Sequence, residues 1–282
     1  MIFQQIINGI IIGATYSLVA LGLNIIWSIT DIPDFSQGGI YVIAAYASYF
    51  AVTLARFPFF AAVLVAMCVG GTLAFLIEKF LYRRWRGRGR IQLLCAIALF
   101  FLLSNVAILL WTAKAKIFPT YLKGSISVLG SIVSYQRLVV LIVAAGLFIL
   151  VYLFIMKTKI GKAIRAASQD REVAAIVGIN IDTVYSTVFF MGGALSGTAA
   201  VLISPLYAVI PSMGDLPLLK SLVVVILGGF GSVAGVLIGG MGLGLIESLG
   251  AVYISSGYQH GFTFIVLIIV LLFFPKGLFG KA

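Results

Sequence analysis

Long apolar runs separated by short polar segments dominate the chain, which has 282 residues. A helix needs about 20 apolar residues to cross the roughly 30 Å hydrocarbon core of a bilayer. Backbone groups inside lipid must be hydrogen-bonded within their own segment, so we interpret these runs as helices. The pattern predicts an all-α polytopic membrane protein with about eight transmembrane helices in one domain, residues 1–282. The predicted crossings are residues 5–29, 38–55, 58–82, 91–112, 137–156, 184–208, 232–252 and 260–275.

A ninth apolar run, residues 217–228, is too short to cross a bilayer comfortably. It is followed by a Gly-rich segment around Gly228–Ser232, where the chain can turn back. We therefore predict a short re-entrant or broken helix near residues 217–230.

Composition excludes a soluble globular domain. Hydrophobic residues make up 62% of the chain and charged residues 10%, too few charges to cover the surface of a soluble protein of this length. The formal net charge of +11 would suit nucleic acid, but most basic residues gather in short stretches, which is the positive-inside pattern. We predict membrane lipid and no nucleic acid as partner. The stretches placed in the cytoplasm are residues 79–90, 157–171 and the C-terminal tail after Pro275.

The topology follows from these stretches and the number of crossings. With the C-terminus in the cytoplasm, counting crossings places the N-terminus outside. The remaining basic residues are then expected outside or near the outer interface. They are Arg56, Lys114, Lys116, Lys123, Arg137 and Lys220.

Motifs for catalysis, metal binding and ATP binding are missing from the sequence. Its one histidine, His260, cannot form a His-rich metal site, and no Walker-type GxxxxGK[ST] segment occurs. We predict a chain that is not an enzyme and binds no cofactor or metal.

A polar, basic island interrupts the apolar pattern within the predicted cytoplasmic loop 157–183. Its sequence, Gly161–Asn180, is typical of one or two short amphipathic helices. A structured and charged loop on a membrane protein suggests a docking site for a soluble partner. The candidate docking residues are Gly161, Arg165, Asp170, Glu172, Ala174, Ala175 and Gly178.

Two Gly-rich breaks are candidates for a substrate path. Each places a serine at the start of a helix rich in small residues, and corresponding breaks in two halves of a transporter point to its path; a chance likeness of two turns is the alternative. The free N–H groups at such a helix start can bind a substrate carboxylate, or the break is a capped turn. The candidates are Asp34, Ser36, Gln37 and Gly38 in one break, and Gly229, Gly231 and Ser232 in the other.

Two polar residues inside apolar runs complete the candidate path. Asn24 ends a stripe of small residues on the first helix, which would turn it toward a helix contact or a pathway. Glu247 is the one acid deep in a late apolar run. An intramembrane carboxylate usually faces the bundle interior and serves function; bracing a neighbouring helix is the alternative.

Four stretches resemble the LivH-type permease subunit of branched-chain amino-acid ABC importers. They begin at Asn8 and run to Asn24, cover Asp34–Gly39 with Ala44–Tyr46, form the island 161–180, and extend from Leu227 through Glu247. The closing segment Phe274–Gly280 belongs to the same resemblance. One departure is Asp34–Gly38, where family members commonly have an Asn-Phe-Ala-His-Gly-type motif, which leaves the exact substrate open.

The resemblance implies a set of partners. It implies a second permease subunit, either a related LivM-type chain or an identical one, and two cytoplasmic ATPase subunits that use ATP. A periplasmic or lipid-anchored substrate-binding protein would deliver a branched-chain amino acid, or a related small amino acid, carboxylate or amide, across the cytoplasmic (inner) membrane. The island would be the coupling helix. An ion-gradient-driven secondary transporter is the alternative, and a membrane-embedded enzyme or assembly factor a third.

Overall fold

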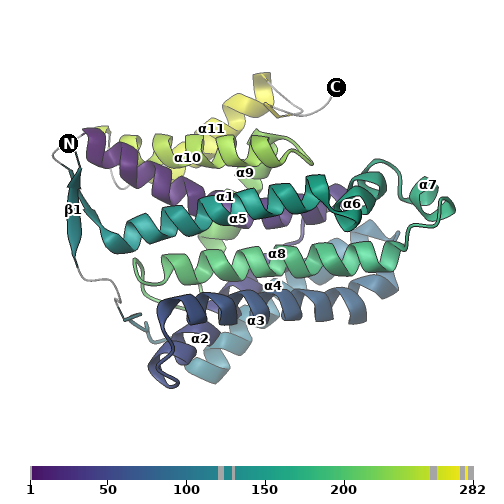
Figure 1. Ribbon diagram of the computed structural model, residues 1–282, viewed down its shortest axis with the longest axis horizontal. Helices are drawn as coiled ribbons and strands as arrows, with labels where there is room; N and C mark the ends of the chain where they lie inside the picture. The colour runs from purple at the N-terminus through teal and green to yellow at the C-terminus, as the bar shows by residue number, and fades with distance from the viewer. Residues whose placement is uncertain (1, 120–123, 129–130, 255–258, 274–276, 279–282) are drawn as a thin grey trace.

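The computed structural model describes residues 2–119, 124–128, 131–254, 259–273 and 277–278. Nearly all regular structure is helical, as the apolar runs predicted (Figure 1). The helices are α1 Ile2–Thr30, α2 Ser36–Thr53, α3 Phe59–Phe80, α4 Gly89–Trp111, α5 Tyr135–Lys157, α6 Lys159–Gln169, α7 Arg171–Ile176, α8 Ile181–Ile203, α9 Asp215–Gly228, α10 Val233–Tyr253 and α11 Gln259–Phe273. A 3₁₀ turn, η1, covers Tyr82–Trp85.

Each of the eight predicted crossings lies on a helix, but the number of spanning helices among the described residues differs. Six are long and apolar enough to cross a membrane: α1, α3 with η1, α4, α5, α8 and α10. Helix α2 has 18 residues and is largely buried by its neighbours. Helix α11 contributes only a shorter apolar stretch, Gly261–Phe273. For the described residues, these criteria therefore do not confirm the predicted count of eight.

Two helix pairs form the centre of the bundle, α1 with α10 and α3 with α8. Glycines face each other where the helices cross, which lets the two backbones touch. A Cβ atom on Gly13 would lie 2.6 Å from the carbonyl oxygen of Gly240. A Cβ atom on Gly193 would overlap the backbone of Gly70. No larger side chain fits at these crossings without moving a helix.

The helix contacts repeat in mirrored order. Helix α2 packs on α3, α4 and α8, as α9 packs on α10, α11 and α1. This is the order expected of two related halves, α1–α4 and α8–α11. It changes the correspondence drawn from the sequence, because α2 is the counterpart of α9 and not of α10. The starts of α2 and α9 also meet, since a Cβ atom on Gly38 would lie 3.0 Å from Leu218.

The short helix expected near residues 217–228 is α9, and it has 14 residues. The chain reverses directly after it through two glycines with left-handed backbones, Gly229 at φ 84° and Gly231 at φ 75°. Only glycine adopts such angles without strain. Helices α9 and α10 then pack as a hairpin, with Gly228 against Gly235.

The two ends of the bundle differ (Figure 1). Helices α6 and α7 lie at one end, and α7 protrudes beyond the other helices. At the opposite end, two short antiparallel strands, β1 Ser125–Val128 and β2 Ser131–Ser134, form a hairpin. The sequence of Ser125–Val128 alternates polar and apolar residues, which is the period of a strand.

The glycine contact between α1 and α10 can be tested by a matched pair of alanine substitutions. A Cβ atom on Gly244 would lie 2.5 Å from the Cα of Gly13, whereas one on Gly242 would meet nothing within 4 Å. We expect Gly244→Ala to lower the free energy of unfolding by about 1–3 kcal/mol, because overpacking forces the helices apart. Gly242→Ala is expected to leave stability within about 0.5 kcal/mol of the parent. Thermal unfolding in detergent measures both, and equal midpoints for the two variants would contradict the contact.

Candidate functional site

The island predicted between two apolar runs folds into α6 and α7 with a defined turn at each end. The Thr158 hydroxyl accepts the backbone N–H of Gly161 at 2.9 Å and caps α6. A Cβ atom on Gly161 would overlap the carbonyl oxygens of the preceding helix, so the turn from α5 requires glycine. Asp170 caps α7 by accepting the N–H groups of Glu172 and Val173 at 2.8 and 3.0 Å. Gly178, at φ 86°, ends it.

Helix α7 presents an apolar tip to its surroundings. Val173, Ile176 and Val177 are 54%, 84% and 70% exposed, while Ala174 of the same helix is buried. Exposed aliphatic residues gathered at one protruding tip are typical of an interaction site. We call these three residues the α7 tip.

Some of the docking residues predicted from the sequence shape the loop, and the others lie at its surface. Gly161, Asp170 and Gly178 set its turns, as described above, and Ala174 packs inward. Side chains at the surface are those of Arg165, Glu172 and Ala175.

The base of α7 is attached to the membrane helices by polar contacts. Arg171 forms an ion pair with Asp31, which directly follows α1. Arg171 also donates to the Tyr185 hydroxyl at 3.3 Å, and that hydroxyl donates to the Ile29 carbonyl at 3.1 Å. Helix α7 is therefore attached to the end of α1 and the start of α8.

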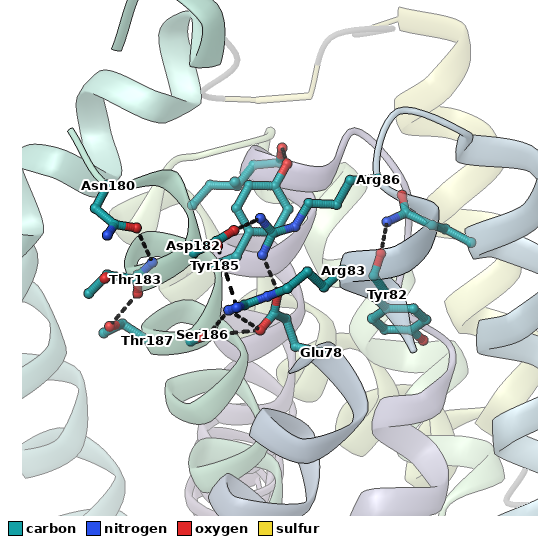
Figure 2. A network of polar contacts seen from close by, with 12 residues as sticks. Glu78, Tyr82, Arg83, Arg86, Asn180, Asp182, Thr183, Tyr185, Ser186 and Thr187 are labelled. Atoms are coloured by element: carbon teal, nitrogen blue, oxygen red, sulfur yellow. Dashed lines mark hydrogen bonds and ion pairs between the residues drawn. The ribbon is translucent and has the colours of Figure 1, made fainter. Parts of the chain in front are cut away.

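A buried carboxylate organises the same end of the bundle (Figure 2). Glu78, in the last turn of α3, is fully buried and forms ion pairs with Arg86 and, at 3.6 Å, with Arg83. Both arginines also pair with Asp182 in the first turn of α8. We call these four residues the α3–α8 clamp.

Further contacts fix the α3–α8 clamp against α8. The Ser186 hydroxyl donates to Glu78 at 2.8 Å, and the Arg86 guanidinium lies 4.1 Å from the centre of the Tyr185 ring. Figure 2 shows these groups converging from α8 and from the end of α3. Because Asp182 follows the α7 segment within a few residues, the clamp joins the loop to α3.

Sequence reasoning missed the clamp. It explained the basic stretch 79–90 by topology alone, and treated residues 58–82 as a plain apolar run. The available signal was Glu78, an acid inside that run and within one or two turns of several arginines.

The predicted break before α2 is a closed polar cluster. The Asp34 carboxylate accepts the backbone N–H of Ser36 at 3.0 Å, the Ser36 hydroxyl at 2.6 Å and the Tyr82 hydroxyl at 2.7 Å. Burial raises the pKa of the Asp34 carboxyl, while the bonds from Ser36 and Tyr82 act against this shift. The sequence suggested that a substrate carboxylate could bind at this helix start. In the structure the carboxylate at this position is that of Asp34. Gln37 accepts a bond from Ser196 of α8.

The second predicted break is braced by Asn24. Its side-chain oxygen accepts the backbone N–H of Gly231 at 3.0 Å, and its amide donates to the Ser232 carbonyl at 3.4 Å. The Ser232 hydroxyl caps α10 by accepting the N–H of Gly235 at 3.0 Å. Asn24 and the turn Gly229–Ser232, which were predicted separately, therefore form one unit.

Glu247 has a cation partner that the sequence did not reveal. It lies fully buried and forms an ion pair at 2.7 Å with Lys220 of α9, which is 3% exposed. Thr263 of α11 also donates to Glu247. The expectation that Lys220 lies at the outer interface is wrong, because the buried acid neutralises the lysine inside the bundle.

The candidate path residues thus gather in three clusters. One surrounds Asp34, with Ser36 and Gln37; Gly38 lies next to it where α2 meets Phe100 and Leu218. The second surrounds Asn24 and the third Glu247.

These features define the class of protein. The chain is a polytopic helical membrane protein with ionisable groups paired inside its bundle, as in transport proteins, and with the helical segment α6–α7 at one end of it. Residues 5–271 match the family model of the branched-chain amino acid transport system permease component. The chain belongs to this family.

Curated relatives resemble the chain over nearly its full length. The high-affinity branched-chain amino acid transport system permease protein BraD of Pseudomonas aeruginosa is 33% identical and is aligned over 99% of this chain and 95% of its own. LivH of Escherichia coli K12 is 31% identical over the same shares. The ribose import permease protein RbsC of Bacillus subtilis matches 44% of this chain and 41% of its own at 30% identity.

A solved structure shares the fold. The chain resembles PsaBC from Streptococcus pneumoniae, solved in complex with Fab, with a TM-score of 0.52 and 13% identity. The match covers 96% of this chain and 92% of that one. At this identity the likeness concerns the architecture alone.

The α3–α8 clamp yields a stability prediction. Arg86→Met removes the nearer partner of a fully buried carboxylate and leaves Glu78 with the more distant Arg83. We expect the free energy of unfolding to fall by about 3 kcal/mol, the low end of the cost of breaking a buried pair. Arg84→Met, an exposed neighbour in the same basic stretch, is the matched control and is expected to change little. Thermal unfolding in detergent compares them; a normal midpoint for Arg86→Met would contradict the clamp.

Proposed function

We propose that the chain is the membrane-spanning permease subunit of an ABC importer in the cytoplasmic membrane. Its substrate would be a branched-chain amino acid or a related small amino acid, carboxylate or amide. The full-length match to the branched-chain amino acid permease family carries this proposal. The helical bundle with ion pairs between its helices supports it.

Energy would come from partner subunits. The sequence contains no Walker-type phosphate loop, so ATP would be bound and hydrolysed by two ATPase subunits in the cytoplasm. The α7 tip is the surface we assign to them, because its aliphatic side chains are exposed on a capped helix. Arg165 and Glu172 would add charged contacts beside the tip. A substrate-binding protein outside and a second permease, LivM-type or identical, would complete the importer.

The polar contacts at the α7 end suggest how movement would reach the membrane helices. An ATPase that pulls on α7 would also pull on α1 through the Arg171–Asp31 pair. It would pull on α3 through the clamp at the start of α8. Ion pairs and hydrogen bonds can exchange partners in discrete steps, which suits a change between two arrangements. Such a change is the basis of alternating access.

Uptake measurements test the proposed function. Membrane vesicles that contain the chain, its second permease, both ATPase subunits and the binding protein are expected to accumulate radiolabelled leucine only with ATP. Vesicles that lack the ATPase subunits are expected to show none, whatever ion gradient is imposed. Gradient-driven uptake by the chain without an ATPase would favour a secondary transporter and contradict the proposal.

The α7 tip gives a second prediction. Ile176→Glu places a charge at an aliphatic contact, and we expect at least about a tenfold loss of ATP-driven uptake, the scale of burying an unpaired charge. The chain should still insert and keep its unfolding midpoint, since Ile176 is 84% exposed. Ile126→Glu, at an exposed position in the hairpin of the opposite end, is the control and should leave uptake unchanged. Parental uptake by Ile176→Glu would remove the tip as the docking surface.

A further inference from the structure

A cavity of about 390 Å³ lies at the end of the bundle opposite α7. Four segments that are distant in the chain form its wall: the start of α1, the start of α5, the turn after α8 and the last turns of α10. Strand β2 contacts both α1 and α5, and Figure 1 shows the starts of these two helices beside the hairpin. The cavity is separate from the α7 tip and from the α3–α8 clamp.

One charged side chain among the described residues lines this cavity, and it is a cation. Arg137, in the first turn of α5, donates to the side-chain oxygen of Asn8 on α1. All eight acidic side chains of the sequence lie in the described part of the chain, and none of them lines the cavity or forms an ion pair with Arg137. A guanidinium has five N–H donors in a planar fork that fits a carboxylate. Its neutralising partner would therefore come from outside the chain.

The hydrogen bonds within the cavity wall leave mainly donors for a ligand. Asn8 accepts the bond from Arg137 with its side-chain oxygen, so its amide NH₂ group remains a donor. The Ser248 hydroxyl donates to the backbone oxygen of Gln5 at 2.8 Å and to its side-chain oxygen at 3.1 Å, so the Gln5 amide also remains a donor. The Tyr207 hydroxyl, in the same wall, can donate as well. A negatively charged ligand that accepts several hydrogen bonds matches this wall.

The rest of the cavity wall is apolar. It consists of Ile11 and Ile12 of α1, Leu206 after α8 and Ala251 of α10. An alkyl group placed against these residues would leave water, which raises the affinity about fourfold for each buried CH₂ group. The cavity volume is near the lower end of the range for ligand pockets, which suits a small molecule with a short aliphatic tail.

We propose that this cavity binds a short aliphatic carboxylate, with its carboxylate at Arg137 and its tail against the apolar wall. The inference rests on the proposed function for its substrate, and it names the groups of that substrate that the permease recognises. Leucine has both a carboxylate and a short aliphatic tail. Its ammonium meets no acidic side chain in the wall, so the site does not select for the ammonium.

Three analogues of leucine test this selectivity on the parent chain. Competition with radiolabelled leucine is measured on the full chain in lipid nanodiscs, without a second permease or a substrate-binding protein that could bind leucine itself. We expect 4-methylpentanoate, which lacks the ammonium, to compete within about fivefold of leucine, because an ammonium without a buried acid partner contributes little. 3-Methylbutylamine, which lacks the carboxylate, and acetate, which lacks the tail, should each compete at least about tenfold more weakly.

Substitution of Arg137 tests the cation, with a basic residue outside the cavity as control. We expect Arg137→Gln to raise the Kd for leucine at least about tenfold, the scale of a lost hydrogen bond between charged groups. Arg137→Lys keeps the charge but not the planar fork, and its Kd should lie between those of Arg137→Gln and the parent. Lys114→Gln removes an exposed cation between α4 and β1 that does not line the cavity, and should leave the Kd unchanged.

The outcomes separate this site from the proposed function. A parental Kd for Arg137→Gln, equal competition by the amine and the carboxylate, or a parent chain that binds no leucine would overturn the site. The proposed function would still stand if the assembled importer takes up leucine with ATP. Carboxylate binding that depends on Arg137, in a chain whose assembled importer shows no ATP-driven uptake, would support the site and reject the proposed function. If Arg137→Gln does not fold, the analogue series on the parent chain decides.

Discussion

The close approach of glycine-lined helices is the constraint on which the rest of the structure depends. Helices α1 and α10 touch through Gly13 and Gly240, and α3 and α8 through Gly70 and Gly193. In lipid, such contacts replace the hydrophobic driving force that holds soluble helices together. They bring α1, α8 and α10 near enough for polar side chains to reach across. The Lys220–Glu247 ion pair and the α3–α8 clamp both require that proximity.

Polar contacts then lie in separate parts of the bundle. At the α7 end, ion pairs join α7 to the end of α1 and join the start of α8 to the end of α3. These segments lie far apart in the chain. The Lys220–Glu247 ion pair is buried among α1, α9, α10 and α11. The mirrored order of contacts relates the two halves, with α2 and α9 as the short helices whose starts meet at Gly38.

Local features of this fold could be predicted from sequence, and contacts between distant segments could not. Apolar runs located the helices, the glycines around residue 230 located the turn after α9, and the polar island located α6 and α7. The partnership of Lys220 with Glu247 was out of reach, because a lysine in a short apolar run gives no sign of which acid neutralises it. Glu78 carried a signal that was missed, because the arginines one or two turns after it were explained by topology alone. The partners that segments distant in the chain supply, Glu247 for Lys220 and Asp182 for the arginines, are known only from the folded structure.

The central claim is that the energy for transport enters at the α7 tip. Photo-crosslinking tests it most directly, with a photoreactive residue at Val177 of the assembled importer and a control residue at Leu54, exposed after α2. The account predicts that the Val177 label forms a covalent adduct with the ATPase subunit and that the Leu54 label forms none. Efficient ATP-driven uptake by an importer in which the Val177 label never reaches an ATPase subunit would contradict it.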